Sequence, residues 1–133
     1  MLSAVTFIVA FFACLQSLVL SAPIPSKGVQ KRSTTGEATY FYLGVGNCGY
    51  DDSGKDSEYI IALDSTTYGS GEYCNTYVSI TDTSTGVTEK GLVRDSCPSC
   101  GVGSIDMSTG LFTALDGSTD AGVFAMSWEF SSD

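Results

Sequence analysis

Two aspartates stand at positions where a carboxyl group could do chemistry. Asp106 lies within residues 105–108 (IDMS), and Asp95 directly follows Arg94. A desolvated carboxyl group can serve as a general acid, and an ionised one accepts hydrogen bonds. Asp106 could also be the polar residue before a helix capped by Ser108, and Asp95 could pair with Arg94. The residue types therefore leave catalytic, ligand-binding and structural roles open for both aspartates.

The absence of histidine excludes several classes of active site. The chain has 133 residues and no histidine, so Ser-His-Asp and Cys-His catalysis, histidine metal sites and a histidine proton shuttle are ruled out. The acidic residues 51–56 (DDSGKD) have a spacing faintly like that of a calcium-binding loop. Ala62 stands where such a loop would end in glutamate, so we expect a solvated loop, with neither a metal nor a cofactor.

Net charge narrows the possible partners. The chain has 15 acidic and 6 basic residues, a formal net charge of −9. Nucleic acids and anionic membrane surfaces attract clustered Lys and Arg. Residues 33–133 keep all 15 acidic residues and only Lys55, Lys90 and Arg94, so 3 − 15 gives −12. We therefore expect no nucleic-acid partner, and no membrane partner once the N-terminal segment is removed.

An apolar segment at the N-terminus has the layout of a secretory signal peptide. Residues 2–20 are almost all apolar, and the chain turns polar at residue 21, which is typical of signal peptides. A transmembrane anchor is the alternative, because the run is nearly 20 residues long. The first basic residue, Lys27, comes only after the change to polar residues. We predict cleavage after residue 21 and a secreted, extracellular protein.

A second processing site is indicated at Lys31-Arg32. These residues end a segment, residues 22–32, that contains Pro, Ser and Lys and has no hydrophobic periodicity. Paired basic residues in an exposed stretch suit a processing protease of the secretory pathway, and a plain solvated linker is the alternative. We predict a signal peptide over residues 1–21, a pro-segment over 22–32 and one mature domain over 33–133.

Four cysteines remain in the mature segment. Cys14 falls in the signal peptide, and an even number of cysteines in an oxidising compartment indicates disulfides, with three possible pairings. We favour Cys48–Cys74 and Cys97–Cys100. A redox motif would need its two cysteines at the start of a helix, whereas a glycine follows Cys100 at once. A zinc site would need a second close pair, and Cys48 and Cys74 are 26 residues apart.

The mature segment has mainly the pattern of short strands. Period-two alternation and short apolar runs between turn residues indicate β-strands. We expect strands at residues 37–42, 59–63, 76–82, 87–95 and 122–130. Apolar spacing indicates a short helix over residues 109–115, capped by Ser108 and ended by Gly117. Many strands around one helix predict a small closed barrel with Trp128 in its core.

Short motifs in a fixed order resemble those of a known group of proteins. They are GEATYF at residues 36–41, GNCG at 46–49, YC at 73–74, VRDSCPSC at 93–100, IDMS at 105–108 and a tryptophan near the end. The chain resembles the RlpA-like double-psi β-barrel group, which includes the first domain of expansins, barwin-like proteins and small secreted fungal proteins. The resemblance covers residues 36–130. It implies a mainly β fold, a six-stranded double-psi β-barrel with one or two short helices.

The resemblance also implies an open groove that binds polysaccharide. Thr39 in the first strand and Asp106 match groove positions of expansin-like barrels, and Asp95 resembles a second groove carboxylate. Tyr40 and Tyr42 flank this groove, and their rings could stack on sugars. For most of the other tyrosines we expect a packing role.

Hydrolysis is not implied by the resemblance. Related family 45 glycoside hydrolases use an acid at the position of Asp106 and a base just after the first strand, where this chain has Leu43. Inverting hydrolysis needs both carboxyl groups, and Asp95 could replace the base only at a suitable distance from Asp106. Lytic transglycosylase relatives also use a histidine. We therefore expect no efficient glycosidase.

Three hypotheses on function follow, in order of preference. The first is a secreted, non-catalytic barrel that binds polysaccharide or cell-wall material in the groove. The second is a protein-binding module, such as a protease inhibitor or effector, because an acidic surface steers protein encounters. The third is a lytic glycosidase with Asp106 as its acid. In each case we expect a monomer.

Overall fold

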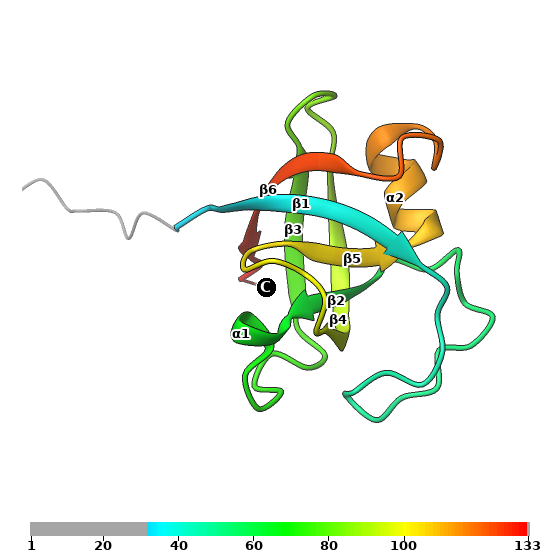
Figure 1. Cartoon of the computed structure of the whole chain (residues 1–133), viewed down its shortest axis with the longest axis vertical. Helices are drawn as coiled ribbons and strands as arrows, with labels where there is room; N and C mark the ends of the chain where they lie inside the picture. Colours follow the sequence, from blue (N-terminus) through cyan, green and yellow to red (C-terminus); the bar gives the residue numbers. More distant parts are fainter. Residues whose placement is uncertain (1–31, 133) are drawn as a thin grey trace, which may run out of the picture. The chain divides into compact units, whose positions relative to one another are not determined.

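The computed structural model describes residues 32–132, which form six strands and two short helices (Figure 1). The elements are, in chain order, β1 (Thr34–Phe41), β2 (Ile60–Asp64), α1 (Ser65–Tyr68), β3 (Tyr77–Asp82), β4 (Thr88–Cys97), β5 (Ile105–Ser108), α2 (Thr109–Asp116) and β6 (Phe124–Phe130). The predicted signal peptide and the pro-segment as far as Lys31 lie outside the described residues, and Arg32 is exposed. No helix in the described part of the chain is long and apolar enough to cross a membrane.

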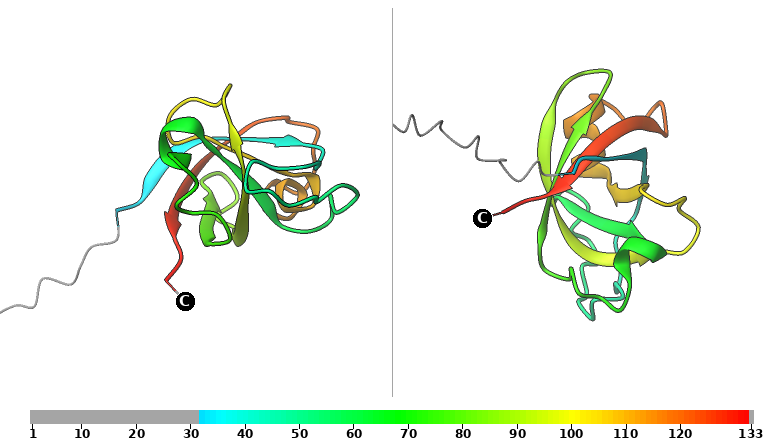
Figure 2. Two further views of the ribbon diagram at one scale, coloured as in Figure 1. Left: turned by 90° about the horizontal axis from the view of Figure 1, so that it is seen from below. Right: turned by 90° about the vertical axis from the view of Figure 1, so that its left-hand side faces the viewer.

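The six strands close into one barrel. Their order around the barrel is β1-β5-β2-β4-β3-β6. The contacts β1–β5 and β2–β4 are parallel, and the other contacts between neighbouring strands are antiparallel. Closure pairs every strand on both sides, and the two views in Figure 2 show the strands around a common centre. The predicted fold class, a mainly β six-stranded barrel with one or two short helices, is confirmed.

The strands expected from the sequence are all present, with shifted bounds. β1 begins at Thr34 rather than at residue 37, because residues 34–38 pair with β6. β4 continues past Asp95 to Cys97, because β2 pairs with it as far as that residue. Asp95 is therefore a strand residue in a fixed register and not part of a free loop.

Alternation along the strands places one set of side chains inside the barrel. In β6, Phe124, Met126 and Trp128 are buried, as their spacing of two predicts. Helix α2 follows the end of β5, and its apolar face packs against the barrel interior there (Figure 1). The core consists of Ala38, Ile61, Leu63, Val78, Ile80, Val93, Ile105, Met107, Leu111, Phe112, Leu115, Phe124, Met126 and Trp128.

Local sequence explains where the helices begin and end. Ser108 caps α2 by accepting a hydrogen bond from the Leu111 amide, and Gly117 ends the helix in the left-handed conformation with φ of 89°. The helix predicted over residues 109–115 is thus confirmed. Asp64 caps α1 by accepting hydrogen bonds from amides two and three residues later. α1 and β5 were not expected as elements, because four residues each are too few to show a period.

The acidic loop that was expected to be solvated is partly buried. Asp52 is only 3% exposed, and its carboxylate lies 3.1 Å from Lys55 Nζ and 3.9 Å from Arg94 Nε. The Arg94 guanidinium also lies over the Tyr50 ring, 3.8 Å from its centroid. Arg94 therefore ties the loop between β1 and β2 to strand β4. Its ion-pair partner is Asp52 and not the neighbouring Asp95, contrary to one expectation from the sequence.

The segment between β4 and β5 is anchored at Gly103. The Trp128 indole Nε1–H donates to the Gly103 carbonyl oxygen at 2.8 Å, and the Gly103 amide donates to Asp64 Oδ2 at 3.0 Å. Trp128 and Asp64 are both buried. Gly36 of β1 passes so close that a Cβ atom there would collide with the Gly103 carbonyl. Gly103 itself has φ of 84°, a conformation that favours glycine.

We predict that Trp128→Phe loosens this anchor. The change removes the indole donor to the buried Gly103 carbonyl, so it should lower the free energy of unfolding by about 1–3 kcal/mol, with a further loss from the smaller ring. Urea unfolding and amide NMR shifts of residues 101–105 measure the effect. Phe124→Leu, which shrinks the core without removing a hydrogen bond, is the control. Equal shifts at residues 101–105 in both variants would contradict the anchoring role.

Two carboxyl groups meet where the turn between β3 and β4 packs on the end of α2. Asp82 is fully buried, and its Oδ1 accepts hydrogen bonds from the Ser84 amide and hydroxyl, both at 2.7 Å, and from the Thr85 amide at 3.3 Å. Its buried Oδ2 has no hydrogen-bond partner within residues 32–132, and the Asp116 carboxyl group lies close enough to Asp82 for their charges to interact. Burial raises the pKa of Asp82, but these hydrogen bonds outweigh it and hold that pKa below its usual value. Partial burial and the neighbouring Asp82 charge raise the pKa of Asp116.

We predict that Asp116→Asn stabilises the protein at neutral pH and not in acid. The folded protein binds the Asp116 proton more tightly than the unfolded chain does, so the wild type loses stability as pH rises through the raised pKa. The asparagine amide donates to Asp82 at every pH. The melting temperature should therefore rise at pH 7, and the gain should vanish by about pH 3.

The matched control for this prediction is Asp120→Asn. It removes the same charge from an exposed residue in the loop that follows α2. A gain for Asp116→Asn that is independent of pH, or one equalled by Asp120→Asn, would show that net charge rather than the carboxyl pair is responsible.

Candidate functional site

Four residues lie in one row across four neighbouring strands. Thr39 of β1 is paired with Asp106 of β5, Asp106 with Ala62 of β2, and Ala62 with Asp95 of β4. Chain neighbours of Thr39, Asp106 and Ala62, such as Ala38, Ile105 and Ile61, belong to the core, so these three residues face the outside of the barrel. Because adjacent strands are about 4.8 Å apart, the Cα atoms of Asp95 and Asp106 lie about 10 Å from each other.

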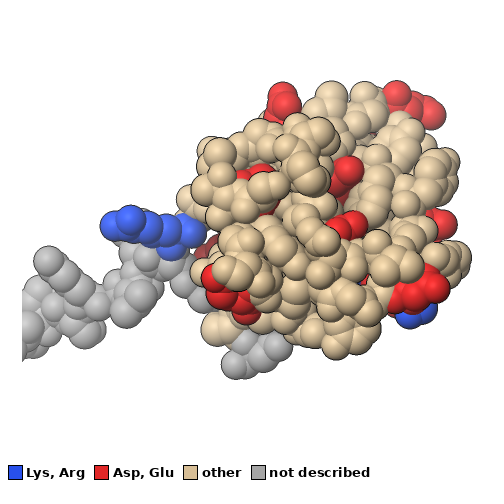
Figure 3. Space-filling view, turned by 60° about the horizontal axis from the view of Figure 1, so that its bottom comes forward, with Lys and Arg blue, Asp and Glu red and all other residues tan. Residues whose placement is uncertain are grey.

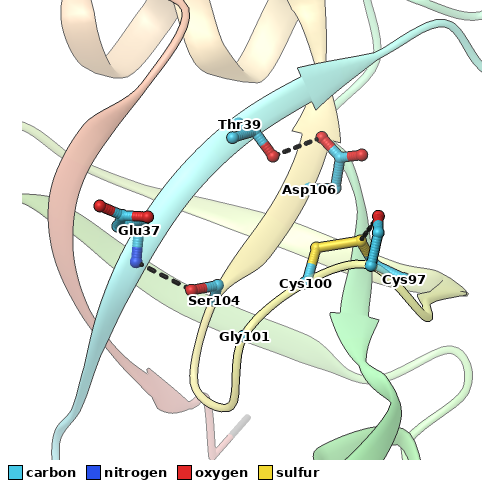
Figure 4. Close-up of a pocket in the computed structure, with 8 residues that line it drawn as sticks. Glu37, Thr39, Cys97, Cys100, Gly101, Ser104 and Asp106 are labelled. Carbon is cyan, nitrogen blue, oxygen red and sulfur yellow. Dashed lines mark hydrogen bonds between the residues drawn. A yellow bond between two sulfur atoms is a disulfide. The ribbon is translucent and has the colours of Figure 1, made fainter.

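One end of this row opens into a polar cavity of about 200 Å³. Figure 4 shows Thr39 on β1 and Asp106 on β5 pointing toward each other, with the Cys97–Cys100 disulfide beside them. On the other side, the Glu37 amide donates to the Ser104 hydroxyl at 3.2 Å. The cavity is lined by Glu37, Thr39, Cys97, Ser99, Cys100, Gly101, Ser104 and Asp106.

Asp106 is a half-buried carboxyl group in the lining of the cavity. The Thr39 hydroxyl donates to Asp106 Oδ1 at 2.9 Å. Burial raises the pKa of Asp106, the hydrogen bond from Thr39 lowers it, and the charge of Asp95 raises it, with a net shift above the usual value. The helix after β5 is capped by Ser108 and not by Asp106. The Asp106 side chain is thus available to a ligand that enters the cavity.

Asp95 lies in the same row but is held by backbone amides. Its Oδ1 accepts hydrogen bonds from the Asn47 amide and from the Ser96 amide, each at 2.8 Å. Asp95 therefore fastens the loop that carries Asn47 to strand β4, and it does not line the cavity around Asp106. Its influence on Asp106 is electrostatic.

The two tyrosines expected beside Thr39 lie elsewhere. Tyr40 faces the opposite side of β1, and its ring packs edge-on against Phe112, with centroids 5.2 Å apart. Tyr42 lines a separate cleft next to α2. Neither tyrosine lines the cavity around Asp106, because strand alternation turns Tyr40 inward and β1 ends before Tyr42. Leu43 has its amide bound to the Asp56 carboxylate at 2.7 Å.

Both disulfides have the pairing that the sequence favoured. Cys48–Cys74 has a Cα–Cα distance of 5.7 Å, and Cys97–Cys100 one of 5.4 Å. The second disulfide forms a wall of the cavity. The cavity residues Glu37 and Ser104 were not expected from the sequence. The alternation of β1 could have identified Glu37, because it lies two residues before Thr39 on the same face.

Acidic side chains are spread over the molecular surface. On the face drawn in Figure 3 they occur at the centre as well as at the periphery, whereas basic side chains occupy only two places at its edge. Within residues 32–132 no group of three or more His, Cys, Asp or Glu side chains is arranged to hold a metal ion.

Solved structures with the same architecture include an expansin. The expansin of Clavibacter michiganensis is 29% identical in sequence, with a TM-score of 0.67 over 77% of this chain and 52% of that chain. A mutant of that expansin in complex with cellohexaose matches at 28% identity and the same TM-score of 0.67. This chain therefore spans about half the length of the expansin structures.

Two further structures match a larger share of their own length. The Streptomyces papain inhibitor is 28% identical, with a TM-score of 0.65 over 76% of this chain and 96% of that chain. Cerato-platanin 3 from M. perniciosa, at 16% identity and a TM-score of 0.57 over 74% of this chain and 94% of that chain, agrees in fold alone. No protein-family model matches the sequence, and no curated protein does. The chain is thus a structural relative of these double-psi β-barrel proteins, as the motifs predicted.

We predict that Asp95 and Thr39 shift the pKa of Asp106 in opposite directions. Asp95→Asn removes a nearby negative charge and should lower the pKa of Asp106, whereas Thr39→Val removes a hydrogen bond to the carboxylate and should raise it. Carboxyl ¹³C NMR titration of Asp106 measures both shifts. Glu37→Gln, which removes the other carboxylate lining the cavity, is the control and should have the smaller effect. Shifts of one sign in both variants would contradict this account.

Proposed function

We propose that this protein is a secreted module that binds a polysaccharide in the cavity around Thr39 and Asp106, without cleaving it. The observation that carries the proposal is the Thr39–Asp106 hydrogen bond of 2.9 Å across two parallel strands, at the mouth of an open polar cavity. An expansin of the same fold has been solved in complex with cellohexaose, which makes a neutral glycan the favoured ligand class.

The cavity offers the groups that sugar hydroxyls need. The Asp106 carboxylate accepts hydrogen bonds, the hydroxyls of Thr39, Ser99 and Ser104 donate or accept them, and Glu37 adds a second carboxylate. Among the residues that the structure describes, no Lys or Arg lines the cavity, so an anionic polymer would gain no charge pairing with them. These features favour a neutral polysaccharide over an acidic one.

Binding without hydrolysis is supported by the residues at the two candidate positions for the catalytic base, Asp95 and Leu43. Inverting hydrolysis needs a carboxylate that is free to activate water opposite the acid. Asp95 is separated from Asp106 by strand β2, and its Oδ1 already accepts two backbone amides. Leu43, at the position of the base in related hydrolases, supplies no carboxylate. We therefore propose a non-catalytic role for Asp106.

Export is the part of this proposal that the N-terminal sequence supports. A signal peptide over residues 1–21 and cleavage after Arg32 would leave a chain that begins next to β1, which starts at Thr34. Cleavage there would remove no residue of the barrel. The disulfides Cys48–Cys74 and Cys97–Cys100 suit an oxidising compartment, and we expect the exported protein to be a monomer.

A protein ligand is the second candidate. The specific observation in its favour is the papain inhibitor, of which this chain covers 96% of the length, against 52% for the expansin. A small acidic barrel can present its loops to a protease, with charge steering the encounter. Inhibition of papain by the purified protein is the corresponding assay.

We predict that Asp106→Asn weakens retention on insoluble polysaccharide about tenfold, because a hydrogen bond to a charged group contributes about 1.5–3 kcal/mol. Sedimentation with cellulose, chitin and cell-wall fractions measures retention, and Asp120→Asn is the charge-matched control outside the cavity. Equal retention of both variants, or none of the wild type, would remove the cavity from the proposal. Release of reducing sugar that Asp106→Asn abolishes would identify a glycosidase instead, and papain inhibition that survives Asp106→Asn would favour the protein ligand.

A further inference from the structure

A second cleft lies beside helix α2 and shares no residue with the cavity around Asp106. Its volume is about 480 Å³. It is lined by Tyr42, Asp56, Ser57, Thr109, Gly110, Thr113 and Thr119. These residues come from the end of β1, the loop before β2, the first turns of α2 and the loop after it. The cleft is therefore built by the same elements that close this end of the barrel.

Tyr42 is the feature of this cleft that packing does not explain. Its side chain is 76% exposed. By contrast, Tyr40, which lies within β1, is packed against the core. Within residues 32–132 the Tyr42 ring and hydroxyl have no ring contact or hydrogen bond. An aromatic face left open beside a polar cleft is the surface on which a sugar ring stacks.

The floor of the cleft is fixed, so the site exists before a ligand arrives. The Asp56 carbonyl accepts a hydrogen bond from the Gly110 amide at 2.8 Å, and the Asp56 carboxylate Oδ1 accepts one from the Leu43 amide at 2.7 Å. A Cβ atom on Gly110 would lie 2.7 Å from the Ser57 carbonyl oxygen, so glycine is what allows the loop to sit on α2. These contacts hold Asp56 against the start of α2 and beside Leu43, the residue that follows Tyr42.

The chemistry of the lining selects a class of ligand. Four hydroxyl groups, from Ser57, Thr109, Thr113 and Thr119, surround one aromatic ring and one carboxylate. In the described part of the chain no basic residue lines the cleft, and the amides of Gly110 and Leu111 at the start of α2 are already bonded within the protein. An anion would therefore find no partner there. A neutral, polyhydroxylated ring matches the open ring face and the hydroxyls together.

We propose that this cleft is a second glycan-binding site, in which the Tyr42 ring stacks on a neutral sugar and Asp56 with the surrounding hydroxyls bonds its hydroxyl groups. The proposal takes its ligand class from the proposed function but uses different residues. Tyr42 is three residues beyond Thr39, and Thr109 is three residues beyond Asp106, along the parallel pair β1–β5. At about 3.3 Å per residue the two sites lie about 10 Å apart, close enough for one polymer surface to engage both.

Amide NMR of the purified protein titrated with cellohexaose and with chitohexaose tests this proposal. We expect perturbed amides at Gly110, Thr113 and Thr119 that persist in Asp106→Asn and disappear in Tyr42→Ala. Tyr42→Phe, which keeps the ring face, should retain them. Tyr77→Ala, which truncates another exposed tyrosine outside both cavities, is the matched control and should behave as the wild type does.

Retention on insoluble cellulose and chitin provides the second measurement. Loss of one stacked ring should weaken retention of Tyr42→Ala about three- to tenfold, since linked contacts reinforce each other on a polymer. Because Tyr42 is largely exposed, the variant should melt at the wild-type temperature. Unperturbed amides at residues 109–119 together with equal retention of Tyr42→Ala and Tyr77→Ala would overturn the proposal.

These measurements distinguish failure of the second site from failure of the proposed function. Perturbation confined to the amides around Thr39 and Asp106 would leave the proposed function standing and overturn the second site. Perturbation confined to the cleft would do the reverse. If neither hexasaccharide perturbs the cleft and Tyr42→Ala instead abolishes papain inhibition, the cleft contacts protein and the glycan assignment is overturned.

Discussion

The arrangement of the candidate site depends on the position of one buried glycine. Gly103 is held through its carbonyl by the Trp128 indole and through its amide by Asp64, and β1 approaches it closely at Gly36. These contacts join β6, β2 and β1 at one point. Because Gly103 lies two residues before β5, its placement brings Ser104 beside Glu37. The cavity is therefore a consequence of a buried hydrogen-bonded anchor rather than of surface loops that happen to meet.

The pKa values of the carboxyl groups in this acidic chain differ because their surroundings differ. At Asp64 and Asp82, hydrogen bonds from amides and hydroxyls outweigh burial and hold the pKa below its usual value. At Asp106 burial outweighs the hydrogen bond from the Thr39 hydroxyl, and the pKa is raised. Most buried carboxylates are thus committed to holding turns and helix starts. Asp106, by contrast, is half-buried and can be reached from the cavity that it lines.

Solved structures with this fold include one protein that binds a glycan and one that inhibits a protease. An expansin is known with cellohexaose bound, and a papain inhibitor of the same fold acts on a protein. The barrel itself does not decide between them, since a fold supports many functions. The side chains on the outer face of the barrel determine which kind of ligand is bound. Within residues 32–132, hydroxyls, carboxylates and an exposed tyrosine line the two cavities and no basic residue does; the proposal of a neutral sugar rests on this lining.

The sequence by itself determined a small closed barrel, the places of its longer strands along the chain and the helix after Ser108, because these depend on periodicity and capping residues. The motifs matched Thr39 and Asp106 to one groove through the family resemblance. Only the tertiary structure decided which residues share the site with them. Tyr40 lies on the other face of β1, and Asp95 is bound by the Asn47 amide across 48 residues of chain. Arg94 pairs with Asp52 from a distant loop instead of with its neighbour. Such contacts depend on strand register and loop packing, which bring together residues far apart in the chain and leave no local pattern behind.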